Sequence, residues 1–298
     1  MMGLTVHAMP GNETPAQALA RLLDAPCHSI AVRAFPDGES LVTVEPVEGT
    51  AVVYCTLGRP NDKLVEIMLA SSAFRANGAT RLVLVAPYMC YMRQDAAFAP
   101  GQAVSQRAVG RFLAGLFDRI VTVDPHLHRQ KDIAAIFPDT DATAVSAAPA
   151  LAAFLHGPDG GRTPILVGPD EESRQWVEAV AAPLGLDVLT AAKTRRGDAD
   201  VSIVIPDVGR VAGRPAVLVD DVISTGATLA RCAELLVDAG ATAVDAIAVH
   251  CLCDDGALVA MRNAGIGTVV TTDSVAHPTN AIALAPLLAE ALKEETGA

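Results

Sequence analysis

The strongest constraint on the fold is a series of short apolar segments, rich in Val, Ile and Leu, that recurs along the chain. Each is apolar on both of its alternating faces, which is typical of parallel β-strands covered by helices on both sides. Six segments are predicted to be strands: Arg81–Tyr88, Arg119–His126, Pro164–Asp170, Ala216–Asp221, Ala243–His250 and Gly267–Ser274.

Segments with a helical pattern alternate with these predicted strands. They span residues 64–77, 103–117, 173–185, 228–239, 254–264 and 280–295. Regular alternation of strand and helix predicts an α/β protein whose sheets are mostly parallel and flanked by helices. A chain of 298 residues is long enough for two domains.

The predicted domain boundary lies near residues 145–150, between a domain of residues 1–147 and a domain of residues 148–298. The last predicted helix could instead pack back on the first domain. The two halves look like variations on one doubly wound unit. The Pro- and Gly-rich segment His156–Pro164 is the best candidate for a linker or a surface loop.

Composition excludes several classes of protein. The formal net charge of −12 argues against a protein that binds nucleic acid without sequence preference, although a metal ion or a local basic cluster can still recruit a phosphate. No apolar run reaches roughly 18 residues, so no membrane span is predicted, and no secretory signal is visible. The six cysteines form no CxxC pair, which is typical of a reducing compartment. We therefore expect a cytoplasmic protein without a membrane partner.

The segment Ala216–Ala230, AVLVDDVISTGATLA, combines two chemical features that favour different ligands. Ser224–Thr228 offers consecutive backbone N–H groups and hydroxyls and then opens a helix, which favours an anion such as phosphate. The adjacent Asp220 and Asp221 would repel a phosphate but can accept hydrogen bonds from sugar hydroxyls or hold a metal. A sugar with a terminal phosphate satisfies both features; the alternative is an acidic strand end followed by a turn. No GxxxxGK[ST] is present, so this is not a P-loop.

Polar side chains also gather where other predicted strands end. Ligands of open α/β sheets bind beyond the carboxyl ends of the strands. The polar residues at these ends are Tyr88, Asp124, His126, Asp170, Asp220, Asp221, Thr272 and Asp273.

The segment from Val217 to Leu229 resembles the phosphoribosyl-pyrophosphate (PRPP) binding motif. That motif is shared by phosphoribosyltransferases and PRPP synthetases. Five more segments resemble synthetase signatures in the same order along the chain: Phe35–Ser40, Pro87–Asp95, Val123–His126, Gly168–Asp170 and Lys193–Arg196. Over nearly its full length the chain is therefore identified as a member of the ribose-phosphate pyrophosphokinase (PRPP synthetase) family. APGQAVSQR and KTRR resemble the short archaeal-type variety more closely.

This resemblance implies two phosphoribosyltransferase-type domains and a transferase that uses ATP and Mg²⁺. The implied reaction transfers diphosphate from ATP to the 1-hydroxyl of ribose 5-phosphate and gives PRPP and AMP. In the matching motif the two carboxylates, Asp220 and Asp221, bind the ribose 2- and 3-hydroxyls. The 5-phosphate is then held by the loop formed by Ser224, Thr225, Gly226, Ala227 and Thr228.

The resemblance assigns two further groups of residues. Lys193 and Arg195 match a basic pair on a mobile loop, where cations would stabilise the transferring group. The segment KTRRGDAD is polar and contains Gly, as expected of such a lid, although a solvated basic turn is the alternative. Asp170 is the expected Mg²⁺ contact, because Mg²⁺ prefers oxygen ligands. His126 is the expected contact to a phosphate or to metal-bound water, although a lone His at a strand end is often structural.

The implied ATP site combines residues from three places in the chain. Arg93, Gln94 and Asp95 match family contacts to ATP, together with His126. The remaining contacts, Phe35, Asp37 and Glu39, match a loop that reaches the adenine from a neighbouring subunit. The resemblance thus implies a homo-oligomer, with a dimer as the minimal unit and a tetramer or hexamer also possible. Without the family, FPDGE is a plain β-turn.

Four residues, His250–Cys253, read HCLC and could suggest a metal site. The spacing does not match a four-ligand zinc site, and there is no second Cys pair. A buried strand end is therefore the preferred interpretation.

Three departures from the family pattern bear on the site. Ala227 stands where archaeal-type members often have Gly, which is acceptable only if its φ is negative. Glu171 and Glu172 follow Asp170, where small residues are usual, and would repel a triphosphate unless they point away or bind metal. After Asp95 comes AAFA where basic residues are frequent. The last two departures could weaken ATP binding or change the nucleotide used.

Two rival functions remain at this stage. A phosphoribosyltransferase would consume PRPP, but its usual chain has one domain. A non-catalytic binding or regulatory homologue would keep the fold, and the presence of both Lys193 and Arg195 disfavours it.

Overall fold

The computed structural model describes residues 3–127, 132–157, 163–196 and 200–296, and leaves the side chains of residues 193–202 undescribed. The chain divides into two compact units. Unit 1 comprises residues 1–146, 274–276 and 283–298, and unit 2 comprises residues 147–273 and 277–282. No helix among the described residues is both long and apolar enough to cross a membrane.

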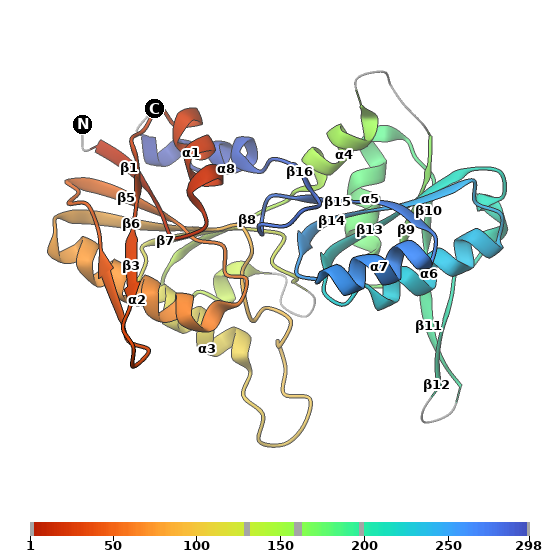
Figure 1. Cartoon of the computed structure of the whole chain (residues 1–298), viewed down its shortest axis with the longest axis horizontal. Helices are drawn as coiled ribbons and strands as arrows, with labels where there is room; N and C mark the ends of the chain where they lie inside the picture. Colours follow the sequence, from red (N-terminus) through yellow and green to blue (C-terminus); the bar gives the residue numbers. More distant parts are fainter. Residues whose placement is uncertain (1–2, 128–131, 158–162, 197–199, 297–298) are drawn as a thin grey trace. The chain divides into compact units, whose positions relative to one another are not determined.

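Unit 1 contains a six-stranded parallel sheet in the order β2-β1-β5-β6-β7-β8. In Figure 1, α1 and α8 lie on one side of this sheet, and α2 and α3 lie on the other. The elements are β1 Gly3–Ala8, α1 Glu13–Leu22, β2 Cys27–Ser29, β3 Ala31–Ala34, β4 Ser40–Thr43, β5 Gly49–Tyr54, α2 Pro60–Ala76, β6 Ala79–Ala86, α3 Ser105–Ala114, β7 Arg119–Val123, the 3₁₀ turn η1 Ile133–Ala135, β8 Asp141–Val145, α8 Ala285–Ala291 and the 3₁₀ turn η4 Lys293–Thr296.

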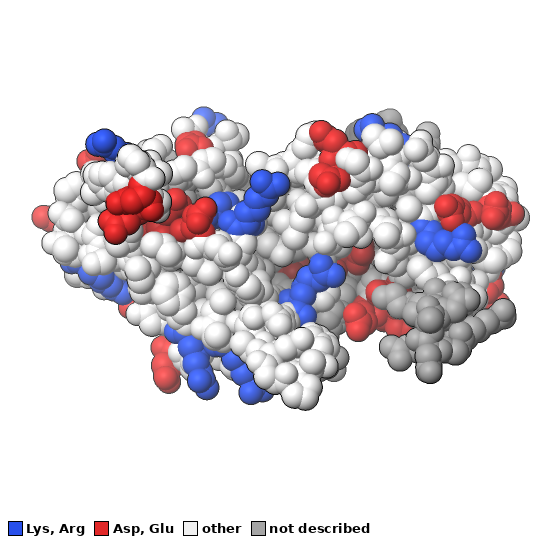
Figure 2. Space-filling view, turned by 60° about the horizontal axis from the view of Figure 1, so that its bottom comes forward, with Lys and Arg blue, Asp and Glu red and all other residues white. Residues whose placement is uncertain are grey.

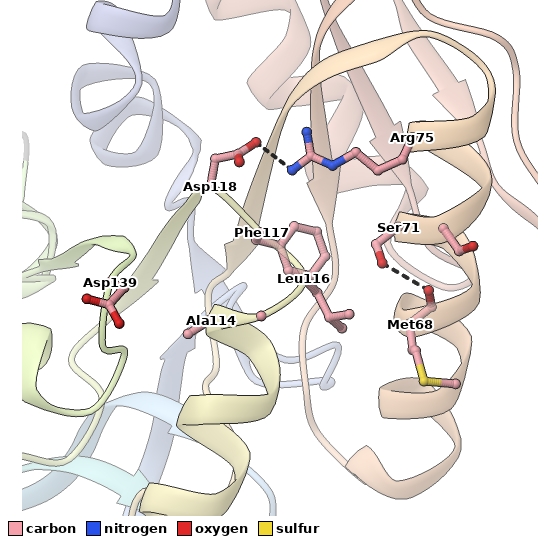
Figure 3. Close-up of a pocket in the computed structure, with 10 residues that line it drawn as sticks. Met68, Ser71, Arg75, Ala114, Leu116, Phe117, Asp118 and Asp139 are labelled. Carbon is pink, nitrogen blue, oxygen red and sulfur yellow. Dashed lines mark hydrogen bonds and ion pairs between the residues drawn. The ribbon is translucent and has the colours of Figure 1, made fainter.

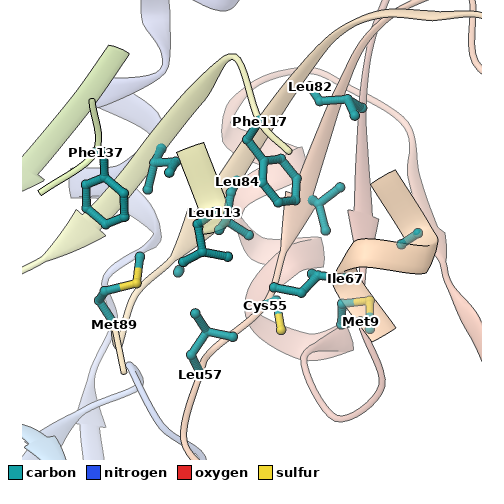
Figure 4. Packing of buried hydrophobic residues seen from close by; sticks show 14 of the residues in the cluster. Met9, Cys55, Leu57, Ile67, Leu82, Leu84, Met89, Leu113, Phe117 and Phe137 are labelled. Carbon is teal, nitrogen blue, oxygen red and sulfur yellow. The ribbon is translucent and has the colours of Figure 1, made fainter. Parts of the chain in front are cut away.

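Strand β6 shows why the central strands have no polar face. Leu82 and Leu84 lie on one side of the strand and pack with Leu113, Phe117 and other side chains of α2, α3 and the strand ends (Figure 4). The alternate residues, Val83 and Val85, are also fully buried. Helices cover both faces of the sheet, so every residue in the centre of the strand is apolar.

Unit 2 repeats this plan, with the parallel order β10-β9-β13-β14-β15-β16. Helices α4 and α5 contact each other, as do α6 and α7. The elements are α4 Ala148–His156, β9 Ile165–Gly168, α5 Arg174–Ala181, η2 Ala182–Leu184, β10 Val188–Thr190, β11 Ala192–Arg196, β12 Asp200–Val204, η3 Val208–Val211, β13 Pro215–Ile223, α6 Ala227–Asp238, β14 Ala243–Cys251, α7 Asp255–Asn263, β15 Ile266–Thr272 and β16 Asn280–Ile282.

The expected α/β class with mostly parallel sheets is confirmed, and each of the six predicted strands is present. The predicted helix over 280–295 is wrong at its start, because residues 280–282 form β16 beside β15 and the helix begins only at Ala285. The segment His156–Pro164 is not a linker between the units. It lies between α4 and β9, inside unit 2, and its residues 158–162 are outside the described part of the chain.

Two antiparallel hairpins stand apart from the main sheets. Strands β3 and β4 pair in unit 1, and β11 and β12 pair in unit 2. Each extends away from the sheet of its own unit as a narrow ribbon (Figure 1). The second hairpin corrects the expectation of a loop over KTRRGDAD: Lys193 and Arg195 lie in β11, opposite Ile203 and Val201 of β12.

Candidate active site

In unit 1 four of the expected ATP residues lie where two neighbouring strands end: Arg93, Gln94, Asp95 and His126. The backbone N–H of Val123, the last residue of β7, donates to the carbonyl of Pro87, just after β6, at 3.2 Å. The turn that follows β6 carries Arg93, which is exposed, and Gln94 and Asp95, which are half-buried. The structure thus brings this turn and the segment after β7 to the same edge of the sheet.

Helix α3 holds this turn in place from its first residues. The buried side chain of Gln106 donates to the carbonyl of Met92 at 3.2 Å, and its backbone N–H donates to the carbonyl of Gln94 at 3.2 Å. The hydroxyl of Ser105 donates to Oε1 of Gln94 at 2.7 Å. Sequence reasoning did not identify Gln106, because a Gln at the start of a helix carries no motif by itself.

The segment Val123–His126 has an uncommon backbone conformation. Asp124 has a φ of 34° and His126 a φ of 54°. The N–H of His126 donates to the carbonyl of Asp124 at 2.8 Å, which closes a γ-turn around Pro125. Positive φ costs a non-Gly residue of order 1–3 kcal/mol, and such residues cluster at functional sites. The strain supports a functional role for this segment.

The FPDGE segment forms the turn between β3 and β4. The N–H of Gly38 donates to the carbonyl of Phe35 at 3.0 Å, and the N–H of Glu39 donates to Oδ1 of Asp37 at 3.2 Å. Gly38 has a φ of 90°, which an L-residue with a side chain rarely adopts. The guanidinium of Arg33 lies 5.4 Å from the ring centroid of Phe35, which is itself 37% exposed. The turn therefore presents an aromatic ring, two exposed carboxylates and a cation at its end.

In unit 2, three carboxylates meet at the ends of the neighbouring strands β9 and β13. Asp170 follows β9, while Asp220 and Asp221 lie within β13, which continues to Ile223. Burial, together with the charges of Asp221 and Asp170, raises the pKa of Asp220 well above its ordinary value. Carboxylates that repel each other in this way form a donor set suited to a cation or to the hydroxyls of a sugar.

The two adjacent carboxylates have different environments. Asp221 is only 2% exposed whereas Asp220 is half-buried, and the backbone N–H of Asp221 donates to Oδ1 of Asp220 at 3.0 Å. Asp170 is fixed by its own turn, because its Oδ1 accepts the N–H of Ser173 at 3.0 Å and its carbonyl accepts the Ser173 hydroxyl at 2.6 Å. Gly168 permits this turn: a Cβ there would lie 2.5 Å from Oγ of Ser173.

The expected phosphate loop, Ser224–Thr228, runs from the end of β13 into the first turn of α6. Gly226 precedes the helix with a φ of 70°, and a Cβ there would lie 2.9 Å from the sulfur of Met261. Gly226 offers no side-chain cap, and Oγ1 of Thr225 accepts the N–H of Ala227, the first residue of α6, at 3.4 Å. A bound anion could replace this long bond and meet the first backbone N–H groups of the helix. Thr225 and Ala227 are exposed, while Ser224 and Thr228 are half-buried.

Comparisons with known proteins agree with this geometry. Residues 4–116 match the family described as the N-terminal domain of ribose phosphate pyrophosphokinase, and residues 142–283 match the phosphoribosyl transferase domain. The chain belongs to the ribose-phosphate pyrophosphokinase family. The first match includes the turn after β6 and the second includes the ends of β9 and β13, whereas Val123–His126 lies between the two matched ranges.

Relatives from several organisms are named ribose-phosphate pyrophosphokinase. The one from Methanopyrus kandleri is 36% identical over 94% of this chain and 95% of its own length. The one from Halobacterium salinarum is 34% identical over 94% of this chain and 98% of its own length. A crystal structure of phosphoribosylpyrophosphate synthetase from Mycobacterium smegmatis has a TM-score of 0.83 and 26% identity, and it covers 98% of both chains. The archaeal relatives, similar in length to this chain, agree with the expected short archaeal-type resemblance.

Two departures from the pyrophosphokinase pattern are accommodated by the structure. Ala227 is the first residue of α6, and the positive φ falls on the preceding Gly226. The side chains of Glu171 and Glu172 are exposed, and Oε2 of Glu171 lies 3.4 Å from the guanidinium of Arg174. The Glu171 charge is therefore partly balanced at the surface.

The charged side chains of this pyrophosphokinase form small local groups. On the face shown in Figure 2, the described Lys and Arg side chains lie in small separate groups among Asp and Glu. With a formal net charge of −12, the field of the whole molecule does not favour anions.

A separate pocket of about 500 Å³ opens in unit 1, between α2 and the segment that follows α3. Figure 3 shows Arg75 reaching across it to Asp118, with Nη2 to Oδ2 at 2.7 Å. Asp139 and Met68 also line it. None of the expected site residues lines this pocket, so it is distinct from the ATP and ribose segments.

Proposed function

We propose that this protein transfers the diphosphoryl group of ATP to the 1-hydroxyl of ribose 5-phosphate. The observation that carries the proposal is the order of groups along β13 and α6, where two carboxylates precede a loop of hydroxyl residues and the start of a helix at Gly226. Ribose 5-phosphate carries a diol at its 2- and 3-positions and an anion at its 5-position. The carboxylates can accept hydrogen bonds from the diol while the loop and helix start meet the phosphate. Family membership of both units supports the same reaction, because a phosphoribosyltransferase would account for only one of the two matched domains.

In the proposed reaction, O1 of the ribose forms a bond to the β-phosphorus of ATP. The bond from that phosphorus to the oxygen bridging the α- and β-phosphates breaks, AMP leaves with this oxygen, and the hydroxyl proton is released. Little covalent chemistry falls to the protein, so alignment and charge neutralisation are its main contributions. Lys193 and Arg195 of the β11–β12 hairpin would stabilise the oxygens of the transferring group.

The residues present fit a magnesium ion. Asp170 and Asp220 offer carboxylate oxygens. Burial and then the charges of Asp221 and Asp170 raise the pKa of Asp220, and a bound cation would relieve the repulsion among these charges. Mg²⁺, when bound with ATP, would neutralise phosphate charge during the transfer. We assign Asp170 to the metal, and His126 to a phosphate or to metal-bound water.

We further propose that the ATP site is shared between subunits. The turn at Phe35, Asp37 and Glu39 ends a hairpin that extends away from its own sheet. An exposed aromatic ring and two carboxylates suit the face and the amino group of adenine. Arg93, Gln94 and Asp95 of another subunit would hold the rest of the nucleotide, so the smallest active assembly is a homodimer.

One assay tests the function. Purified protein is incubated with ribose 5-phosphate, ATP and Mg²⁺, and AMP and PRPP are quantified. We expect the two products in equal amounts, and no AMP when ribose 5-phosphate is omitted. Consumption of added PRPP with a free base, without ATP-dependent PRPP formation, would instead identify a phosphoribosyltransferase. Absence of both reactions would identify a non-catalytic homologue.

A further inference from the structure

Two thiols and an imidazole meet in unit 2 at a point where no function has been assigned. Cys251 is the last residue of β14, Cys253 follows two residues later, and His277 lies between β15 and β16. The Sγ of Cys251 lies 3.4 Å from Sγ of Cys253 and 3.6 Å from Nε2 of His277. The three candidate ligand atoms all lie within 4.8 Å of one another.

These separations match the ligand sphere of a tetrahedral metal ion. With Zn–S bonds of about 2.3 Å and Zn–N bonds of about 2.0–2.1 Å, tetrahedral geometry places two sulfurs about 3.8 Å apart, and a sulfur and a nitrogen about 3.5 Å apart. A disulfide, in contrast, needs the two sulfurs about 2.05 Å apart, so the two Sγ atoms would have to move much closer to each other. A cation could enter between the thiols and the imidazole with small side-chain adjustments.

The imidazole of His277 is already held in an orientation that suits a ligand. Its Nδ1 lies 2.7 Å from Oγ1 of Thr279, which in turn lies 2.8 Å from Oγ1 of Thr271. The backbone N–H of His277 donates to Oδ1 of Asn280 at 2.8 Å. Histidine ligands usually use one ring nitrogen for the metal and the other for such a hydrogen bond. Nε2 lies on the side of the thiols, where it is also 3.2 Å from the backbone carbonyl of Cys253, while Nδ1 accepts the N–H of Thr279 at 3.3 Å. A metal ion at Nε2 would replace the contact to this carbonyl.

We propose that Cys251, Cys253 and His277 bind a thiophilic cation, Zn²⁺, with a fourth position left for water. Binding replaces the protons of two thiols by two sulfur–zinc bonds and releases these protons to solvent.

The place of the cluster in the sheet gives the cation a structural role. Cys251 pairs in register with Ile223 of β13, and the N–H of Leu252 donates to the carbonyl of Ile223 at 2.8 Å. Ile223 directly precedes the Ser224–Thr228 loop. A zinc ion would therefore join the end of β14 to the segment before β16 and support the strand that carries this loop. The proposal does not depend on the proposed reaction.

Zinc binding can be measured on the full chain. Protein purified under reducing conditions and treated with a chelator is titrated with Zn²⁺, and then with Co²⁺, whose thiolate complexes absorb in the near ultraviolet. We expect one ion per chain, a thiolate-to-cobalt band and a higher melting temperature with zinc. Cys253→Ser and His277→Ala should each weaken binding at least a hundredfold, whereas Cys27→Ser, which changes a half-buried thiol of unit 1, should not.

A second measurement needs no variant. Zinc should protect Cys251 and Cys253 of the wild-type chain from alkylation, as read by mass spectrometry, while 10 mM Mg²⁺ should not. The proposal is overturned if the wild-type chain takes up no zinc, or if the cluster variants bind it as tightly as the wild type. It is also overturned if the two thiols form a disulfide in air and the reduced protein shows no protection by zinc.

Discussion

Glu295 accepts two hydrogen bonds from the guanidinium of Arg81, with Nε to Oε2 at 2.7 Å and Nη2 to Oε1 at 2.8 Å. Its Oε1 also accepts from Nη1 of Arg119 at 3.0 Å. The side chains of Glu295 and Arg119 are only 5% and 7% exposed. These ion pairs hold the C-terminal segment 283–298 against the beginnings of β6 and β7, which explains why this segment belongs to unit 1.

Removing the Glu295 carboxylate should therefore destabilise unit 1. We expect Glu295→Ala to lower the free energy of unfolding by about 3 kcal/mol, because it leaves a buried guanidinium without its main partner. Glu294→Ala is the matched control: Glu294 is 87% exposed and 3.6 Å from Arg119, and its effect should stay within about 0.5 kcal/mol. Urea unfolding measures both. Equal losses for the two variants would contradict the role of this ion pair.

The same ion pair predicts a pH dependence. Burial alone would raise the pKa of Glu295, but hydrogen bonds from Arg81 and Arg119 outweigh it and leave the pKa below its ordinary value of 4.5. The stabilisation is therefore complete above that value and is lost as the pH falls through the lowered pKa. The stability difference between wild type and Glu295→Ala should shrink accordingly in acid, which unfolding experiments at a series of pH values can follow.

Part of the strand pattern was predictable from the sequence. The predicted strands are apolar on both faces, as in β13 and β14, but β1 and β5, which lie inside the sheet of unit 1, were also missed. The missed edge strands β2, β10 and β16 have only three residues each and are partly exposed, so neither length nor alternation marks them. The hairpin at Lys193 was missed because Gly and charge favour a loop, while its two strands are stabilised by pairing with each other.

The candidate site was also predictable only in part from the sequence. Asp220, Asp221 and the following loop form one continuous motif, so the order of residues alone reveals their chemistry. The thiol and imidazole cluster could not be recognised in this way. His277 comes 24 residues after Cys253 and reaches it only because β15 pairs with β14 and β16 pairs with β15. The CxC pair was the available signal, and the third ligand required the fold.

Lys193 should act on turnover rather than on substrate binding. We expect Lys193→Ala to lower kcat by roughly 10²–10³ with little change in KM, because its cation would stabilise charge that develops during the transfer. Thr194→Val changes the same strand without removing a charge and should keep near-normal kcat. Steady-state kinetics that give Lys193→Ala an unchanged kcat would reject the assignment.

Asp220 is expected to lower the stability of the ligand-free protein while it strengthens the binding of ribose 5-phosphate. Its raised pKa means that the folded state favours the protonated carboxyl, so the charged form destabilises the protein once the pH exceeds the ordinary value of 3.8. Without substrate or cations, Asp220→Asn should therefore melt at a higher temperature than wild type at neutral pH. Its affinity for ribose 5-phosphate should fall about tenfold to a hundredfold.

Two comparisons separate these effects. Asp255→Asn, which changes an exposed carboxylate in the first turn of α7, should alter neither ligand affinity nor melting temperature appreciably. The wild-type protein should use 2-deoxyribose 5-phosphate poorly, because one hydroxyl of the bound diol is missing. Equal use of the two sugars would exclude the diol assignment for Asp220 and Asp221.

The shared ATP site predicts that two inactive proteins rescue each other. A Phe35→Ala, Asp37→Ala double variant lacks the exposed turn, and Arg93→Ala lacks the contact expected from the other segment, so each should be nearly inactive alone. After mixing and reassembly, a mixed dimer contains one site with an intact turn and an intact Arg93. With random exchange, roughly a quarter of all sites are then restored, by the two-fold symmetry of such a dimer.

Glu48→Ala, a change at an exposed residue between β4 and β5, provides an active control for the exchange. Activity near a quarter of wild type supports the shared site. No recovery after verified exchange would mean that the site is built within one chain, as would full activity of a monomer in dilute solution.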